Sequence, residues 1–244
     1  YNTHQQYTLI FSIKYFLIFF IFLGSINFLF AAEESSKKIE LPDNFVSGDS
    51  ERGSQLVESC SACHGTDGNS ISSDWPKLAG QNQKYLYEQL QYFKDGVRMN
   101  ALMMSVTPYL QTLDDEDLLD IAAFYSNYET SVGQAKNDEE LLNVGTQLYR
   151  FGNMKKGIPA CTSCHAVYGQ GNSLAGFPAV AGQQIGYLTS TLKAYRSKER
   201  NTGELSEMMQ SIAQNLSDDE IDALANYMHC LLYTSPSPRD YPGS

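Results

Sequence analysis

The sequence predicts an all-α protein that contains two tandem copies of one small domain. Apolar residues recur at helical spacing in several segments, and no stretch alternates convincingly as a β-strand. A unit of about 100 residues also occurs twice in register, since Pro76 and Pro178 lie 102 residues apart and Leu113 and Leu216 lie 103 apart. That length is typical of a small domain. With 42% hydrophobic residues, the 244-residue chain has enough apolar side chains for a core in each copy.

Each copy is expected to contain three helices, of which the first leads into a cysteine motif and the last follows a methionine-bearing loop. The helices are expected at residues 49–61, 82–95 and 114–128 in the first copy and at 138–151, 184–197 and 217–229 in the second. The last helices begin in "LDDED" and "LSDDE", whose acidic and hydroxyl side chains cap free amides and oppose the helix dipole. The polar segment 129–137 is the expected linker.

The two ends of the chain are expected to lie outside both copies. Lys14, an apolar run and small residues ending at Ala32 are typical of a secretory signal, although the run is almost long enough to be a retained membrane anchor. The stretch "CLLYTSPSPRD" back-translates to a transposon-end adapter, so it is interpreted as a sequencing artefact. The expected organisation is a signal or anchor at 1–32, domain 1 at 33–130, domain 2 at 131–229 and the artefact at 230–244.

The stretch "ESCSACHGTDGNS" places Cys60 and Cys63 one helical turn apart, with His64 directly after the second thiol. A disulfide redox site uses two such cysteines but has no need of the histidine. A zinc site could use all three side chains but needs a fourth ligand. Covalent haem attachment uses all three together, because each thiol adds to a vinyl group and the histidine becomes an axial iron ligand.

The second copy repeats this motif in "ACTSCHAVYGQGNS", where Cys161, Cys164 and His165 stand 101 residues after their counterparts. Two copies at a domain-sized interval make a chance match improbable and favour two covalently attached haem c groups. With Cys230 assigned to the artefact, all remaining cysteines lie in the two motifs, and no pair is left for a structural disulfide.

The second axial ligand of each iron is expected to be methionine. The chain has four histidines, of which His4 precedes the apolar run and His229 is single, so two bis-histidine haems cannot be built. A methionine pair recurs upstream of the last helix in both copies, as "NALMMSVTPYL" and "ELSEMMQSIAQ". Met209 is the expected ligand in the second copy. Met104 is the expected ligand in the first, with Met103 left open because that loop is two residues longer.

Each ligating histidine also needs an acceptor for its other ring N–H, which fixes its tautomer and orientation. The prolines Pro76 and Pro178 are placed alike in the loops after the two motifs, and a proline still offers its carbonyl oxygen. Their backbone carbonyls are therefore the expected acceptors, although the alternative of two ordinary turn prolines stays open.

The formal net charge of −11 and the pI of about 4.7 limit the classes of partner. Such a surface repels phosphate backbones, which argues against nucleic acid. It suits a protein that meets a basic patch on its partner, in a salt-dependent way.

With these motifs, residues 45–229 resemble the diheme cytochromes c of the c4 type. The narrowest similarities are "WPKLAGQ", "FPAVAGQ", "LYRFGNMKKGIPACTSCH" and "MMQSIAQNLSDDEI". The resemblance implies two class I cytochrome c domains joined by a short linker, with low-spin haems that have His and Met ligands. It implies a periplasmic carrier, often loosely at the membrane, that moves electrons from quinol-oxidising complexes such as quinol:cytochrome c reductase to terminal oxidases.

The expected function is therefore electron transfer, without substrate chemistry of the protein's own. One alternative is a diheme peroxidase-like enzyme, which needs one iron with an open site; the near-equivalence of the two copies argues against it. Another is a cytochrome subunit held by a flavoprotein dehydrogenase, whose sequence could look the same.

Overall fold

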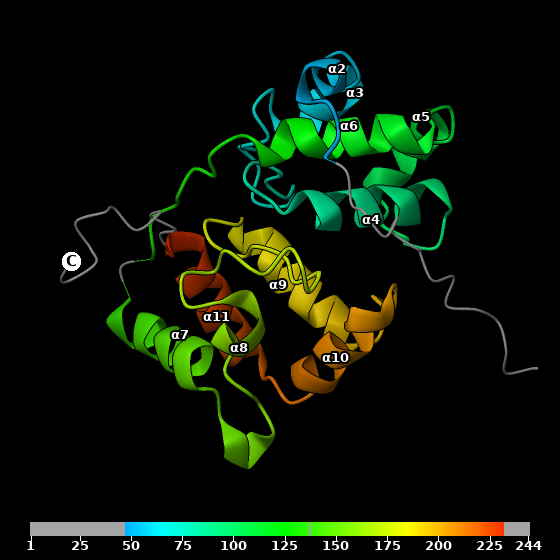
Figure 1. Cartoon of the computed structure of the whole chain (residues 1–244). Coiled ribbons are helices and arrows are strands. Elements are labelled where there is room, and N and C mark those ends of the chain that lie inside the picture. Colours follow the sequence, from blue (N-terminus) through cyan, green and yellow to red (C-terminus); the bar gives the residue numbers. More distant parts are fainter. Residues whose placement is uncertain (1–46, 137, 232–244) are drawn as a thin grey trace, which may run out of the picture. The chain divides into compact units, whose positions relative to one another are not determined.

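The computed structural model describes residues 47–136 and 138–231, and both ranges belong to the same structural unit (Figure 1). Every regular element in this described part is a helix, apart from two isolated β-bridges, so the all-α prediction is confirmed. The first half contains α2 (Ser50–Ser54), α3 (Glu58–His64), α4 (Gln83–Lys94), η1 (Met103–Ser105), α5 (Thr107–Leu110) and α6 (Asp115–Ser126). The second half contains α7 (Glu139–Phe151), η2 (Met154–Lys156), α8 (Thr162–His165), α9 (Ile185–Arg196), α10 (Glu204–Ala213) and α11 (Asp218–Cys230).

The predicted starts of the last helices are confirmed in detail. In α6 the side chain of Asp114 accepts the backbone N–H of Asp117, whose own carboxylate accepts the N–H of Asp114. In α11 Ser217 and Glu220 form the same reciprocal box. Both boxes satisfy amides that have no partner within the helix.

Two expectations about the helices were wrong. The single helix expected at 49–61 is broken into α2 and α3, because the chain turns at residues 55–57 before the cysteine motif. The expected methionine-bearing loops are partly helical: Met103 starts η1, and Met209 lies inside the ten-residue helix α10. Local sequence pattern did not separate these short helices from loops, since tertiary packing rather than propensity stabilises them.

A glycine brings two helices into close contact at equivalent positions of the two halves. The helix α2 packs on α6 at Gly53, where an added Cβ would lie 2.1 Å from the carbonyl oxygen of Asp120. The helix α7 packs on α11 at Gly145, where a Cβ would lie 2.3 Å from the carbonyl oxygen of Ala223. No side chain fits at either position. Both glycines therefore allow the short distance between the first and the last helix of their half.

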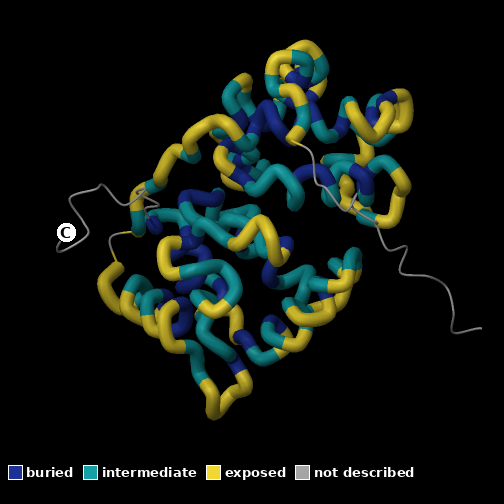
Figure 2. Tube along the Cα trace, in the orientation of Figure 1, coloured by how far each residue is buried: buried dark blue, intermediate teal, exposed yellow. Residues whose placement is uncertain are grey.

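Each half has its own hydrophobic core, and Figure 2 shows buried residues in helices such as α6 and α11, most of whose length is buried. The first core centres on side chains of α4, α5 and α6, among them Leu86, Leu110, Leu118 and Ile121. The second centres on α7, α9 and α11, among them Leu148, Leu188, Ile221 and Leu224. The prediction of one core per copy is confirmed.

The second half ends later than the expected boundary at residue 229. Helix α11 runs to Cys230, and Leu231 is buried in the second core. Residues 1–32, the expected signal or anchor, and 232–244, most of the expected artefact, lie outside the described residues. Among the described helices, none combines the length and the apolar character needed to cross a membrane.

The expected linker leaves α6 and reaches α7 without regular structure in its described residues. Its first part is held by the first half, since the side chain of Asn69 donates to the carbonyl of Glu129 and accepts the N–H of Ser131. Its second part is held by the second half, since Gly133 donates its N–H to the carbonyl of His229. His229 thus lies in a fixed contact rather than on an open helix end.

Candidate haem sites

The first cysteine motif lies on the short helix α3, which packs into the first half. Cys60 is only 8% exposed and His64 only 6% exposed, and both belong to the last two turns of this helix. The helix ends at His64, and the φ of 84° at the next residue, Gly65, turns the chain away directly after the histidine. Because the chain turns at residues 55–57, α3 does not continue α2. The position of the cysteine motif therefore depends on the packing of α3 against the core and not on α2.

The imidazole of His64 has a defined orientation. Its Nδ1 lies 2.8 Å from the backbone carbonyl oxygen of Pro76, and because a carbonyl oxygen only accepts, Nδ1 carries the proton. His165 makes the same bond to the carbonyl oxygen of Pro178 at 2.9 Å. The expectation for both prolines is confirmed. In each half Nε2 is the nitrogen that keeps its lone pair for a metal ion.

Burial favours the neutral form of both histidines. It lowers the pKa of His64 and of His165 below the ordinary value, and the hydrogen bond to the proline carbonyl acts in the opposite direction without reversing the shift. A neutral imidazole is the form that coordinates a metal ion. The same environment that buries the ring therefore prepares it as a ligand.

The first thiol of each motif differs from the nucleophilic thiol of a dithiol redox site. Burial, followed by the neighbouring Cys63, raises the pKa of Cys60 to about 11. Burial raises the pKa of Cys161 to about 12. Nucleophilic cysteines of disulfide oxidoreductases have lowered pKa values instead. The first thiol of each motif is thus packed against the core of its half, where it can bond to a haem that is itself buried there.

The second motif lies on a different local structure but also places its histidine at the end of a short helix. Cys161 precedes the single-turn helix α8, which carries Cys164 and His165. The next residue, Ala166, has φ 63° and ψ 168°, close to the backbone of Gly65 in the first half. Its carbonyl oxygen accepts the hydroxyl of Tyr149, a fully buried side chain of α7.

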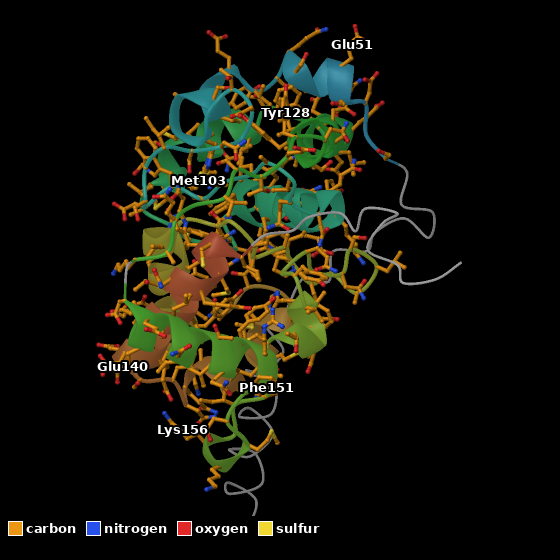
Figure 3. All side chains as sticks on the ribbon, turned by 90° about the vertical axis from the view of Figure 1, so that its left-hand side faces the viewer. Glu51, Met103, Tyr128, Glu140, Phe151 and Lys156 are labelled. Carbon is orange, nitrogen blue, oxygen red and sulfur yellow. The ribbon has the colours of Figure 1, made fainter. Side chains whose placement is uncertain are left out.

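The methionine pairs each have one half-buried and one exposed member. Met103, labelled in Figure 3, packs against the first core, whereas Met104 is 53% exposed. Met209 packs against the second core, whereas Met208 is 43% exposed. Of the expected ligands, Met209 therefore lies toward its half's core. In the first half the core-facing side chain is Met103, the residue left open beside Met104.

These donors fit a covalently attached haem in each half. Each half combines two free thiols at the attachment spacing, an imidazole with its Nε2 available, and a half-buried thioether. The zinc alternative needs a larger set, and within residues 47–136 and 138–231 no group of three or more His, Cys, Asp or Glu side chains is arranged to hold a metal ion.

The loops that follow the two motifs meet each other across the halves. The side chain of Gln183 accepts the backbone N–H of Lys77 at 2.8 Å and donates to its carbonyl at 2.9 Å. Gln81 makes the same pair of bonds to Ala179, both at 2.8 Å. The two glutamines end the repeated "LAGQ" and "VAGQ", 102 residues apart. The repeat signalled both residues, but nothing in the sequence indicated that each binds the other half.

Comparison with known proteins identifies the same two domains. The family model for cytochrome c matches residues 50–128 and 145–231. Cytochrome c4 from Stutzerimonas stutzeri is 42% identical over 192 residues, which cover 76% of this chain and 90% of the relative. Cytochrome c4 from Azotobacter vinelandii is 37% identical over the same shares of both chains.

Two further comparisons concern a solved structure and a related branch. The crystal structure of reduced recombinant cytochrome c4 from Pseudomonas stutzeri superposes with a TM-score of 0.71 at 42% identity, covering 76% of this chain and 100% of that one. A thiosulfate dehydrogenase electron acceptor from Thiomonas intermedia is 33% identical over 70% of this chain and 77% of the relative. The chain therefore belongs to the cytochrome c family, as a diheme cytochrome of the c4 type whose two domains each bind a haem c covalently.

Proposed function

We propose that this protein is an electron carrier in which both irons are closed by protein ligands, so that it performs no substrate chemistry of its own. The observation that carries the proposal is the repetition of one arrangement in both halves: a histidine oriented by a proline carbonyl, buried in the first half and half-buried in the second, with a half-buried methionine beside the core. An enzyme would need one of the two sites to differ, with an open position at its iron.

The proposed attachment residues and ligands follow from this arrangement. Cys60 and Cys63 in the first half, and Cys161 and Cys164 in the second, form thioether bonds to the haem vinyl groups. His64 and His165 bind iron through Nε2. Met209 is the other ligand in the second half. In the first half the half-buried position of Met103 favours it over Met104, the ligand expected from the sequence.

The chain's residues support transfer of an electron in three ways. The proline carbonyls hold the two imidazoles in one orientation, so little rearrangement accompanies a change in the charge of the iron. The cores limit the access of water to the histidines, of which His64 is buried and His165 half-buried, and thioether ligation favours the reduced state. The haem iron supplies the chemistry, a one-electron change between ferric and ferrous states.

The proposed partners are redox proteins outside the cytoplasm, in the periplasm. A quinol-oxidising complex, such as quinol:cytochrome c reductase, is the proposed donor, and a terminal oxidase the acceptor. The net charge of −11 supports docking to basic patches, with association rates that fall as ionic strength rises.

A second candidate function follows from the relative named a thiosulfate dehydrogenase electron acceptor. In that case this protein takes its electrons directly from a substrate-oxidising dehydrogenase, as a dedicated acceptor or subunit. Rapid reduction by a dehydrogenase, together with slow reduction by a quinol-oxidising complex, would favour this candidate over the first.

Ligand exclusion tests the central proposal. The full chain, matured with its haems, is expected to show no change in its visible spectrum when the reduced form meets carbon monoxide. Met103→Ala and Met209→Ala should each open one iron and create carbon monoxide binding, while the exposed Met208→Ala serves as the matched control. If the unmodified protein binds carbon monoxide at either iron, the carrier proposal fails and the peroxidase-like alternative takes its place. If Met104→Ala opens the first iron and Met103→Ala does not, Met104 is the ligand.

A further inference from the structure

The peptide group that orients the first imidazole is hydrogen-bonded on its other side as well. The Pro76 carbonyl, which accepts Nδ1–H of His64, and the backbone N–H of Lys77 belong to one planar peptide group. That N–H donates to the side-chain oxygen of Gln183, in the other half, at 2.8 Å. A continuous series of hydrogen bonds therefore runs from His64 through this peptide group to Gln183.

The second half contains the same series with the roles of the halves exchanged. The Pro178 carbonyl accepts Nδ1–H of His165, and the N–H of the same peptide group, at Ala179, donates to the side-chain oxygen of Gln81 at 2.8 Å. Ala179 stands 102 residues after Lys77, and the two glutamines are also 102 residues apart. Each half thus provides the glutamine that contacts the histidine acceptor of the other half.

The hydrogen bonds around each glutamine fix which end of its side-chain amide faces the peptide group. The oxygen of Gln183 accepts the N–H of Lys77 and also the N–H of Gln184 at 2.9 Å, while its nitrogen donates to the Lys77 carbonyl. The opposite orientation would place the amide N–H groups against two N–H donors. Gln81 has the equivalent set of contacts.

Both glutamine side chains lie away from water, since Gln183 is 6% exposed and Gln81 is 7% exposed. A peptide group whose N–H is hydrogen-bonded carries more negative charge on its carbonyl oxygen, so consecutive hydrogen bonds strengthen one another. The low local dielectric makes this polarisation larger than it is in water. The carbonyls of Pro76 and Pro178 are therefore stronger acceptors than they would be without the glutamines.

We propose that Gln81 and Gln183 are positioning residues that set the electron-donating strength of the histidine ligand in the opposite half. Each glutamine accepts the peptide N–H and so strengthens the bond between the proline carbonyl and Nδ1–H, which gives the imidazole more anionic character. A more electron-rich ligand favours ferric iron and lowers the reduction potential. This inference rests on the proposed function, since it requires that both imidazoles bind iron.

Substitution of each glutamine should affect the haem of the opposite half. In the full mature chain Gln183→Leu should raise the midpoint potential of the haem in the first half, and Gln81→Leu that of the haem in the second half. The haem in the substituted half should keep its potential. A spectroelectrochemical titration followed by proton NMR measures both midpoints, and the neighbouring residues Gly65 and Ala166 assign each histidine's resonances to its half.

The sign of the shift separates polarisation of the peptide group from a role in packing. If leucine loosened the boundary and admitted water, the ferric charge would be better solvated and the potential would fall instead. The Nδ1–H resonance of the reduced protein is a second measurement. In Gln183→Leu a weaker bond to Pro76 should move the resonance of His64 to lower chemical shift and leave that of His165 in place.

The residues next to the two glutamines are matched controls. Gln184 and Asn82 also bind the opposite half, at the carbonyls of Ser70 and Phe177, but these carbonyls belong to other peptide groups than the ones that the histidines contact. Gln184→Leu and Asn82→Leu each remove a hydrogen bond between the halves. They should leave both potentials and both Nδ1–H resonances unchanged.

Gln183→Glu keeps an acceptor for the N–H of Lys77 on a side chain of the same length. A carboxyl oxygen can accept this bond whether the group is protonated or ionised, so the potential of the first-half haem should stay at or below that of the unmodified protein. If Gln183→Leu fails to mature, this variant replaces it, and Gln81→Glu does the same for the second half. A raised potential in either of these variants would contradict the proposal.

Three results for the leucine variants that hold two haems would overturn the proposal. They are unchanged potentials, a rise confined to the half that carries the substitution, and a fall in potential, which would assign the glutamines to packing alone. Failure of the proposed function is separate and appears earlier, as a haem count below two or as carbon monoxide binding in the unmodified protein.

Discussion

The two halves reach the same histidine geometry from different local structures. In the first half Gly53, which sets the helix approach, is seven residues before Cys60; in the second Gly145 is sixteen residues before Cys161. The added residues form η2 and the bridge between Asn153 and Ile158, and Figure 3 labels Phe151 and Lys156 in this region. The distances from Nδ1 to the proline carbonyl nevertheless differ by only 0.1 Å. The loop that follows the histidine therefore determines the orientation of its imidazole, and the segment that precedes the cysteines does not.

The residue after each histidine offers a second contrast. Gly65 and Ala166 have nearly the same backbone, φ 84° and ψ 156° against φ 63° and ψ 168°. This region is suited to glycine, and alanine there is strained. The second half therefore tolerates strain that the first half avoids, at a point where the chain must turn away from the ligand.

The largest expected effect comes from removing the anchors of one half. The double variant of Cys161→Ala and Cys164→Ala should hold one covalent haem per chain instead of two, and its second half should lose much of its stability, since the bound group completes a small core. A pyridine haemochrome assay with mass spectrometry measures the count. The reciprocal variant at Cys60 and Cys63 is the control; if either double variant keeps two covalent haems, the attachment sites are elsewhere.

The next effect concerns the glycine at the helix contact. Gly145→Ala should lower the free energy of unfolding by roughly 2 kcal/mol, because its Cβ would overlap the carbonyl of Ala223. The cost of this overlap exceeds the gain in helix propensity. Gly53→Ala should behave alike. Chemical denaturation measures both, with the exposed Asn143→Ala as control. A stabilised Gly145→Ala would contradict the close approach of α7 to α11.

A smaller effect tests the strained turn. Ala166→Gly should raise the free energy of unfolding by about 1 kcal/mol, since relief of strain exceeds the added chain entropy of glycine. Gly65→Ala should lower it by a similar amount. Opposite signs for the two substitutions are the expected result of thermal unfolding experiments. Equal signs would mean that the backbones of the two turns differ.

The smallest effect is a pH dependence confined to the second half. Burial raises the pKa of Glu220, but hydrogen bonds from Lys156 and Ser217 lower it by more, so the net shift is downward. Such a group stabilises the folded state above its unfolded pKa, and the contribution disappears as pH falls through the folded pKa. Glu220→Gln should cost about 0.5 kcal/mol at pH 7 and nothing in strong acid. An equal cost at both pH values would assign the effect to the capping box alone.

Much of the fold and of the site could be predicted from the sequence, because those parts depend on local pattern and on repetition. The capped starts of α6 and α11, the two cysteine motifs and the proline acceptors are all signalled by residues at fixed spacing. The break between α2 and α3, the helix α10 and the core-facing position of Met103 could not be predicted. They are decided by contacts with residues far along the chain, such as Asp120 against Gly53.

The most direct test of the central claim, two equivalent closed haem domains, is a reductive titration of the full mature chain combined with a haem count. The account predicts two covalent haems, uptake of two electrons per chain, sharp low-spin bands and the weak red band of methionine-ligated ferric iron. One haem per chain, uptake of a single electron, or a high-spin component that binds carbon monoxide would contradict it.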